Sequence, residues 1–260
     1  VGDTWETTKP TFTKKTASLV TVGSQSGVDM YIRDTRGSVQ DPNAVNTALM
    51  VKSLTREISR LVIQGEPESV TTEFEGLDSL CRAETRMMAM DDGNIDGPGA
   101  AETELTMDRL DAMIDQIDDG MTKPDALIMN NTMRRKLSSL ARASSVSGIY
   151  ESNVDMFGHK VSMYDGIPIV RTNFITDSET YNDSSTWPSS SATSIFGVRF
   201  GEENEGYTLL HNGPVMQPRM RNLGIKRDEE IEEFRLVVYL QGLTFSTKQI
   251  IGLGGIDSAA

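Results

Sequence analysis

This sequence contains almost no cysteine or histidine. It therefore lacks the side chains on which many enzymes and disulfide-bonded extracellular domains depend. The 260 residues include one cysteine, Cys81, and two histidines, His159 and His211. A lone cysteine forms no internal disulfide and has no second thiolate with which to hold a metal, which argues against a cystine-stabilised secreted domain. The sequence lacks the ~20 consecutive apolar residues of a membrane helix, and no secretory signal peptide stands at Val1. We therefore expect a soluble, globular protein with no membrane partner.

Basic charge is also scarce. The chain has 38 acidic and 25 basic residues, which gives a net charge of −13. Such a surface repels a phosphate backbone, so direct readout of nucleic acid is not expected. Apolar residues make up 37% of the chain. That share can fill a core, and the length allows one large domain or two modest ones.

The most regular pattern predicts one long helix over residues 42–64. Asp41-Pro42 supplies an N-cap and a proline at the first helical position, and Gly65 provides the stop. Arg56 and Arg60 lie one turn apart, and we expect them to face solvent or a neighbouring subunit. The inward positions follow a period near 3.6 residues: Val45, Ala48, Leu49, Val51, Leu54, Ile58, Leu61 and Val62.

The rest of the chain alternates short strands and helices. Runs 18–22 and 28–32, separated by Gly23–Gly27, predict a hairpin, and residues 176–193 predict an exposed loop. A helix over 107–119, a strand over 126–129 and a helix capped by Asn130 or Asn131 predict an α+β or α/β layer. Arg134, Arg135, Lys136 and Arg142 are expected on the outer face of this last helix. Further strands are predicted over 160–164, 167–171, 194–200, 207–210, 215–221 and 231–245.

One loop has part of a metal-binding pattern. Asp92-x-Asn94-x-Asp96-Gly97 matches the first half of a calcium loop, in which oxygen ligands alternate along the chain. The twelfth position should be a bidentate glutamate, but it is Thr103. We interpret the loop as a solvated acidic turn, and a metal-dependent hydrolase using these three oxygen-bearing residues is kept as an alternative.

No other constellation supports catalysis. The acidic run 228–233 is interpreted as a solvated loop and strand face, and Cys81 as a small buried hydrophobe. No serine stands in a G-x-S-x-G elbow, and no phosphate-binding loop is present. Gly252-x-Gly254-Gly255 has no helix after it, so it fails as a dinucleotide site. We therefore assign no catalytic, cofactor-binding or metal residues, expect no cofactor, and predict a protein that is not an enzyme.

The order of elements, from an extended arm through one long helix to an α/β layer and a closing strand, resembles a known family. It is similar to the Hong Kong 97-type major capsid protein of tailed viruses, a fold shared with encapsulin nanocompartments. The stretches that carry the resemblance are Leu54–Gly65 followed by Phe74-Glu75-Gly76-Leu77, Asp125–Leu137, Gly158–Asn173 and Phe234–Phe245.

This resemblance implies an α+β capsid fold with a discontinuous domain. Residues 1–16 would be the remnant of an extended loop that lies over a neighbour. Residues 17–75 and 208–260 would form a peripheral domain, and residues 76–207 an inserted axial domain. The family's N-terminal arm and the first half of its extended loop have no counterpart here.

The resemblance further implies a structural role. The chain would assemble with itself into pentamers and hexamers of an icosahedral virion shell in the host cytoplasm. The shell would enclose double-stranded DNA without reading its sequence, with portal and decoration proteins as further partners. Some members cross-link a lysine to an asparagine, for which Lys14 or Lys15 and Asn222 would be the candidates. The alternatives are an encapsulin-like shell around a protein cargo, the metal-dependent hydrolase and a monomeric binding module.

Overall fold

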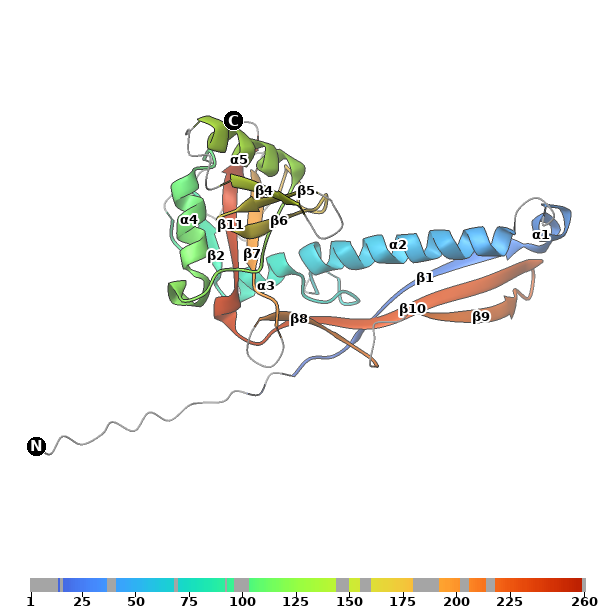
Figure 1. Cartoon of the computed structure of the whole chain (residues 1–260). Coiled ribbons are helices and arrows are strands. Elements are labelled where there is room, and N and C mark those ends of the chain that lie inside the picture. Colours follow the sequence, from blue (N-terminus) through green and yellow to red (C-terminus); the bar gives the residue numbers. More distant parts are fainter. Residues whose placement is uncertain are drawn as a thin grey trace, which may run out of the picture.

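The computed structural model describes residues 14, 16–36, 41–67, 70–91, 93–95, 103–143, 150–154, 160–179, 192–201, 206–213 and 218–258. Its helices are α1 (Met30–Arg36), α2 (Pro42–Gln64), α3 (Leu77–Ala83), α4 (Met107–Asp115) and α5 (Asn131–Ala143), with 3-10 turns η1 (Ile117–Gly120) and η2 (Thr247–Gln249). Its strands are β1 (Val20–Asp29), β2 (Met87–Ala89), β3 (Ala126–Met129), β4 (Tyr150–Val154), β5 (Lys160–Tyr164), β6 (Ile167–Arg171), β7 (Ala192–Val198), β8 (Tyr207–His211), β9 (Arg219–Ile225), β10 (Ile231–Thr244) and β11 (Ile250–Asp257). Figure 1 shows an elongated half, in which α2 lies along a long sheet, and a compact half at one end of it.

Helix α2 confirms the predicted span of 42–64. The Asp41 carboxylate accepts a hydrogen bond from Asn43 N–H at 3.0 Å, and Pro42 occupies the first turn. At the other end Gly65 N–H donates to Leu61 O at 2.9 Å. Gly65 has φ −58° and ψ 127°, so it ends the helix in an extended conformation and not in the left-handed one.

Strand β1 corrects the predicted hairpin. It pairs with β10 without interruption, from Val20 opposite Leu240 to Asp29 opposite Ile231. Gly23 and Gly27 lie inside this one strand because they let β10 approach closely. A Cβ on Gly23 would lie 2.7 Å from Leu236 O, and one on Gly27 would collide with the Ile231 side chain. The predicted second strand, 28–32, instead passes into α1.

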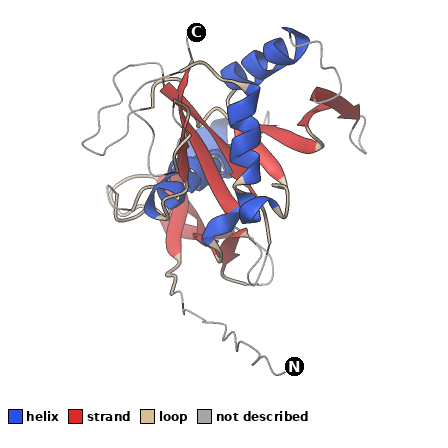
Figure 2. Ribbon diagram, turned by 90° about the vertical axis from the view of Figure 1, so that its left-hand side faces the viewer, coloured by secondary structure: helices blue, strands red, loops and turns tan. Residues whose placement is uncertain are grey.

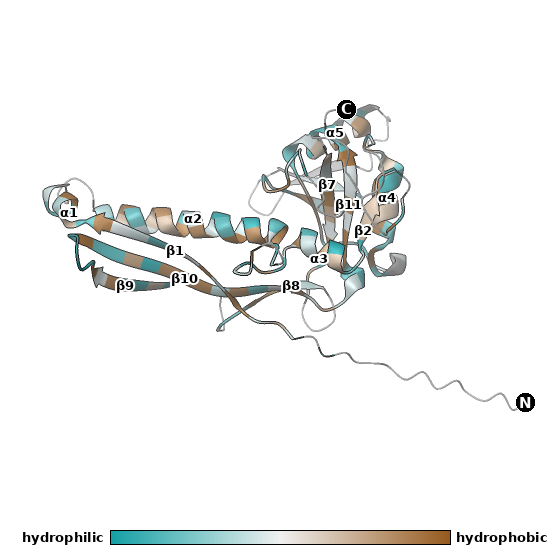
Figure 3. Ribbon diagram, turned by 180° about the vertical axis from the view of Figure 1, so that it is seen from behind, coloured by the Kyte–Doolittle hydropathy of each residue, from teal (hydrophilic) through white to brown (hydrophobic). Residues whose placement is uncertain are grey.

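The sheet of the elongated half is antiparallel and is centred on β10. Its order is β1-β10-β8, and β9 pairs with the first part of β10. Phe234, Leu236, Val238 and Leu240 alternate along β10 and pack with buried residues of α2 in one cluster. Figure 3 shows the matching alternation of hydrophobic and hydrophilic bands along α2. The sheet therefore buries one face against the long helix.

The compact half is built on a sheet of order β2-β11-β7-β3-β6-β5-β4. Successive residues of its central strands point to opposite faces, so Leu127 and Met129 join one core cluster and Ile128 the other. Helices α4 and α5 cover the first face, which Figure 2 views from the outside. Helix α3 and the end of α2 cover the second. The sheet is thus the middle of three layers.

Several compact-half elements differ from the prediction. Strands β2, β4 and β11 were not expected, and the helix expected over 107–119 ends at Asp115 before the 3-10 turn η1. Strand β11 holds the Gly252-x-Gly254-Gly255 segment. A Cβ on Gly252 would lie 2.7 Å from Met87 Sδ, so glycine is needed here for packing. Residues 208–260 were expected together in one domain. Strand β11 instead pairs with β2 and β7, and so lies in a different sheet from β8, β9 and β10.

Some predicted features lie outside the described residues. These are most of the 1–16 arm, Lys15, Asp92, Asp96, His159 and most of the 176–193 loop.

Candidate assembly surface

The elongated half ends in a surface that we call the distal tip, made of residues 29–36, 41–49 and 219–233. It combines α1, the first turns of α2 and the hairpin of β9 and β10, at the end of the molecule away from the compact half (Figure 1). Polar contacts hold its local geometry, and several of its exposed residues are apolar.

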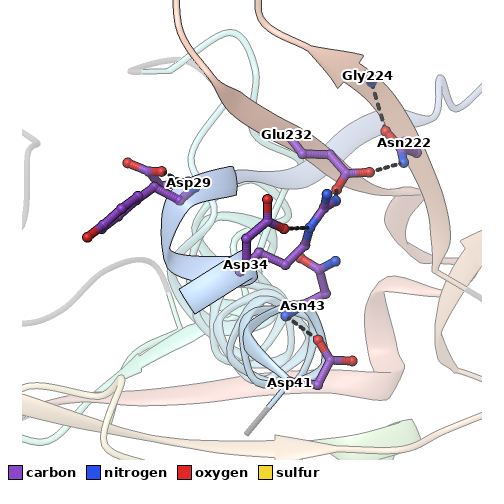
Figure 4. Close-up of polar contacts among 9 residues, drawn as sticks. Asp29, Asp34, Asp41, Asn43, Asn222, Gly224 and Glu232 are labelled. Atoms are coloured by element: carbon purple, nitrogen blue, oxygen red, sulfur yellow. Dashed lines mark hydrogen bonds and ion pairs between the residues drawn. The ribbon is translucent and has the colours of Figure 1, made fainter. Parts of the chain in front are cut away.

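Arg33 on α1 fastens the helix to the sheet. Its Nη1 donates to Glu232 Oε2 at 3.0 Å, and its Nε donates to Asp34 Oδ1 at 3.5 Å. The second Glu232 oxygen accepts from Asn222 Nδ2 on β9 at 2.7 Å. Asn222 Oδ1 in turn accepts from Gly224 N–H at 2.7 Å (Figure 4). This chain of contacts ties α1, β9 and β10 together.

Two further contacts place the helices. Asp29 Oδ1 accepts from Tyr31 N–H at 2.8 Å and so satisfies a backbone donor at the start of α1. Ser26 Oγ on β1 donates to Asn46 Oδ1 on α2 at 2.8 Å. The tip is therefore a defined surface and not an unsupported loop.

Apolar side chains gather on this supported tip. Tyr31 is 72% exposed, Leu49 60% and Ile225 59%. The helical pattern predicted that Val45, Ala48, Leu49 and Val51 face inward. This is wrong, because all four are exposed and the sheet covers only the side of α2 that holds Met50 and Leu54. Exposed apolar groups on one part of a surface are typical of protein contact sites, which makes the tip a candidate assembly surface. The other exposed apolar residues of the tip are Ile32, Val45, Met220 and Leu223.

Strands β1 and β9 of this sheet each have an open edge. Within the described part of the chain, β1 pairs with β10 alone, and so does β9. All residues of β9 except Gly224 are exposed. Open strand edges present unpaired backbone donors and acceptors to a second chain.

A groove of about 1,020 Å³ lies between α2 and β6. Lys52, Arg56 and Arg171 are exposed along it, and Val170 and Phe174 contribute apolar surface. Arg56 thus faces solvent, as predicted.

Arg60 corrects the prediction that both arginines of α2 face outward. Its Nη2 donates to Glu57 Oε1 at 2.7 Å and to Glu73 Oε1 at 2.5 Å. These hydrogen bonds raise the pKa of the Arg60 guanidinium above its ordinary value. The second Glu73 oxygen accepts from Glu66 N–H at 3.3 Å. Arg60 therefore holds the segment after α2 against the helix.

A cavity of about 390 Å³ lies where α2, α3 and the seven-stranded sheet meet. Glu179 lines it beside Asp78, Arg82 and Ser194, and Arg82 Nη1 is 3.7 Å from Glu66 Oε1. Burial raises the pKa of the Glu179 carboxyl to about 8, and burial also raises the pKa of Asp78.

Replacing Glu179 with glutamine is expected to weaken the pH dependence of stability. Between about pH 4.5 and about pH 8 the Glu179 carboxyl is protonated in the folded state, whereas in the unfolded state, where its pKa is 4.5, it has lost the proton. Its contribution to the free energy of unfolding is therefore fully present below about pH 4.5 and is lost as the pH rises through about 8. Denaturant titrations between about pH 5 and about pH 9 should give a flatter profile for Glu179→Gln than for the wild type, with the exposed-site variant Glu104→Gln as control. Equal slopes in all three proteins would contradict the assignment.

The remaining sequence candidates do not come together as a reactive site. Cys81 is buried, as predicted, and burial raises the pKa of its thiol. In the acidic run, Glu229 pairs with Lys226 at 2.8 Å, and Glu233 accepts from Gln25 at 3.2 Å. Among the residues that the structure describes, no group of three or more His, Cys, Asp or Glu side chains could hold a metal ion. None of the helices in those ranges is long and apolar enough to cross a membrane.

Asn222, the predicted cross-linking asparagine, lies on β9 at the distal tip. Its amide is engaged on both sides, by Glu232 and by Gly224 N–H. The cross-link itself stays a prediction.

Sequence reasoning missed the distal tip. A signal for it exists in the chain, because apolar residues at 45, 49 and 51 widen the apolar stripe of α2 beyond what one sheet face can cover.

Comparison with known proteins gives the fold and the family. The chain resembles the holo-SrpI encapsulin complex from Synechococcus elongatus PCC 7942 with a TM-score of 0.69 at 18% identity, over 93% of this chain and 75% of that one. It resembles the capsid of the empty GTA particle with a TM-score of 0.55 at 13% identity, over 97% and 80%. It also resembles the satellite phage P4 procapsid with a TM-score of 0.52 at 12% identity, over 97% and 76%. These likenesses show the Hong Kong 97-type capsid fold. No curated protein matches the chain.

The family comparison corrects the predicted function. The model of the type 2A encapsulin shell proteins, SrpI-like, matches residues 104–252. This finding overturns the expected tailed-virus capsid around double-stranded DNA, and nothing supports the virion, portal or decoration partners that came with it. Because the match spans more than half of the 260 residues, the chain belongs to the SrpI-like family of type 2A encapsulin shell proteins.

Proposed function

We propose that this chain assembles with copies of itself into a closed nanocompartment that encloses a protein cargo. The observation that carries the proposal is the match of residues 104–252 to an encapsulin shell family. The role is structural: a shell subunit needs large surfaces that fit other subunits, and it needs no catalytic pocket.

The distal tip and the open strand edges support this proposal. The tip offers apolar side chains on a frame fixed by Arg33 and Glu232. The outer edges of β1 and β9 can add main-chain contacts to a neighbour. An elongated subunit also gains contact area without needing a larger core.

We assign the two halves of the molecule to the two expected domains. The peripheral domain would consist of residues 17–75 with β8, β9 and β10. The axial domain would consist of residues 76–207, and we add β11 to it because that strand lies in the seven-stranded sheet.

Negative-stain microscopy with light scattering tests the proposal. We expect closed particles of megadalton mass. Their absorbance spectrum should be that of protein, and a denaturing gel should show a second polypeptide when the shell is purified from its own host.

Two outcomes would contradict it. A stable species of 28.6 kDa at all salt and protein concentrations would favour the monomeric binding module. Shells that contain nucleic acid in place of a protein would contradict the cargo.

A further inference from the structure

Helix α4 presents a row of carboxylates to solvent. Asp108, Asp111 and Asp115 are all exposed, and their spacing of three and four residues places them on one side of the helix. Leu110, Met113 and Ile114 on the other side are buried in the compact core. We call these three carboxylates the acidic stripe.

Helix α5, on the same face of the sheet, presents the opposite charge. Arg135 and Arg142 are exposed, Arg134 and Lys136 are half-buried, and the helix contains no acidic residue. Its buried side again joins the compact core. We call Arg135 and Arg142, which lie seven residues apart, the basic stripe.

These charges are not used to pair the two helices within one subunit. Arg135 Nη2 donates to Thr132 Oγ1 at 3.4 Å and Arg142 Nε donates to Ser138 O at 3.1 Å, both within α5. In the ranges that the structure describes, Asp108, Asp115, Arg135 and Arg142 form no ion pair.

The helix dipole favours only some of these charges: Asp108 lies in the first turn of α4 and Arg142 in the last turn of α5, where each is stabilised. Asp115 lies at the carboxyl end of α4, where a negative charge meets the negative end of the helix dipole. Arg134 and Arg135 lie near the amino end of α5, where a positive charge is equally unfavourable. Like charges three and four residues apart along α4 repel one another as well. Asp115 and Arg135 therefore stabilise neither helix of the isolated subunit, whereas Asp111 is held within it by a hydrogen bond from Tyr164 Oη at 2.6 Å.

The two stripes match in sign and in length. Asp108 and Asp115 are seven residues apart, as are Arg135 and Arg142. At about 1.5 Å per residue each stripe is roughly 10 Å long. Each copy of the chain thus carries both halves of one electrostatic contact.

We propose that the acidic stripe of one subunit binds the basic stripe of a second copy of this chain. The inference rests on the proposed shell function and names one subunit contact within it. The pairing sets the relative position of neighbours, since complementary charges across an interface favour the correct register and penalise like-charge arrangements.

Charge reversal on each helix tests the contact. The first variant is Asp108→Lys with Asp115→Lys, the second is Arg135→Glu with Arg142→Glu, and the third combines all four substitutions. Each of the first two creates like-charge stripes, so we expect at least about tenfold fewer closed particles by light scattering and microscopy. The third variant restores opposite signs, and we expect its particle yield to return close to the wild-type level.

The third variant is also the matched control, because it contains every substitution of the other two. Circular dichroism of the three proteins shows whether each folds. Wild-type yield from both single-helix variants would overturn the contact, and so would a folded third variant that stays as unassembled as the first two. A wild-type chain that forms no shell at all would contradict the proposed function instead, so the two failures are distinguishable.

Discussion

Replacing Tyr31 and Ile225 with aspartate is expected to abolish shell formation and to leave a folded subunit. The two side chains are 72% and 59% exposed in the single chain, so the fold loses little when they change. In a shell they would be covered by a neighbour. A large apolar side chain gains about 1.5–3 kcal/mol on full burial, and a carboxylate at the same place must be desolvated instead. Because a shell repeats the same contact many times, a small loss at each contact prevents closure.

Light scattering and circular dichroism together measure this effect. The matched control is Met121→Asp with Val70→Asp, which adds the same charge at positions that are 83% and 44% exposed and lie outside the distal tip. We expect particles from the control and only small species from the tip variant. Particles at the wild-type level from both would show that the tip is not an assembly surface.

Local signals in the sequence were sufficient to predict helix α2 and its bounds. Its cap, its proline and its apolar period all act within one or two turns, and the observed bounds match the predicted ones. The strands β3, β5 and β6 were predicted for the same reason, since short apolar runs between turn residues define them.

Glycines produced the largest errors, because their role depended on distant residues. Gly23 and Gly27 resemble turn residues locally, but they make room for β10, which is more than 200 residues away in sequence. The glycines of β11 likewise hid a buried strand that packs on Met87. Arg60 was misplaced for a related reason, since its partner Glu73 belongs to a separate segment.

The candidate surface could be predicted even less well. Whether Tyr31, Leu49 and Ile225 are buried depends on how α1, α2 and β9 meet, and no single segment encodes that. The error in function has another origin. Viral capsids and encapsulins share one fold, and a fold alone does not determine what fills the shell.

Replacing Gly65 or Gly76 with alanine is expected to destabilise the subunit severely. These residues lie against each other between α2 and α3, with Gly76 N–H donating to Gly65 O at 2.8 Å. A Cβ on Gly65 would collide with Phe74 O and lie 2.6 Å from Leu61 O, and one on Gly76 would lie 2.5 Å from Gly65 N. All of these neighbours are backbone atoms, which no rotamer change can move. We expect a loss of about 3 kcal/mol in the free energy of unfolding, measured by denaturant titration.

Gly120→Ala is the matched control. Its φ of +79° is strained for alanine, but its nearest contact is 3.4 Å away, so the loss should stay near 1 kcal/mol. A smaller loss at Gly65 and Gly76 than at Gly120 would show that the chain between the two halves is loosely packed, and that these glycines are not required for their close approach.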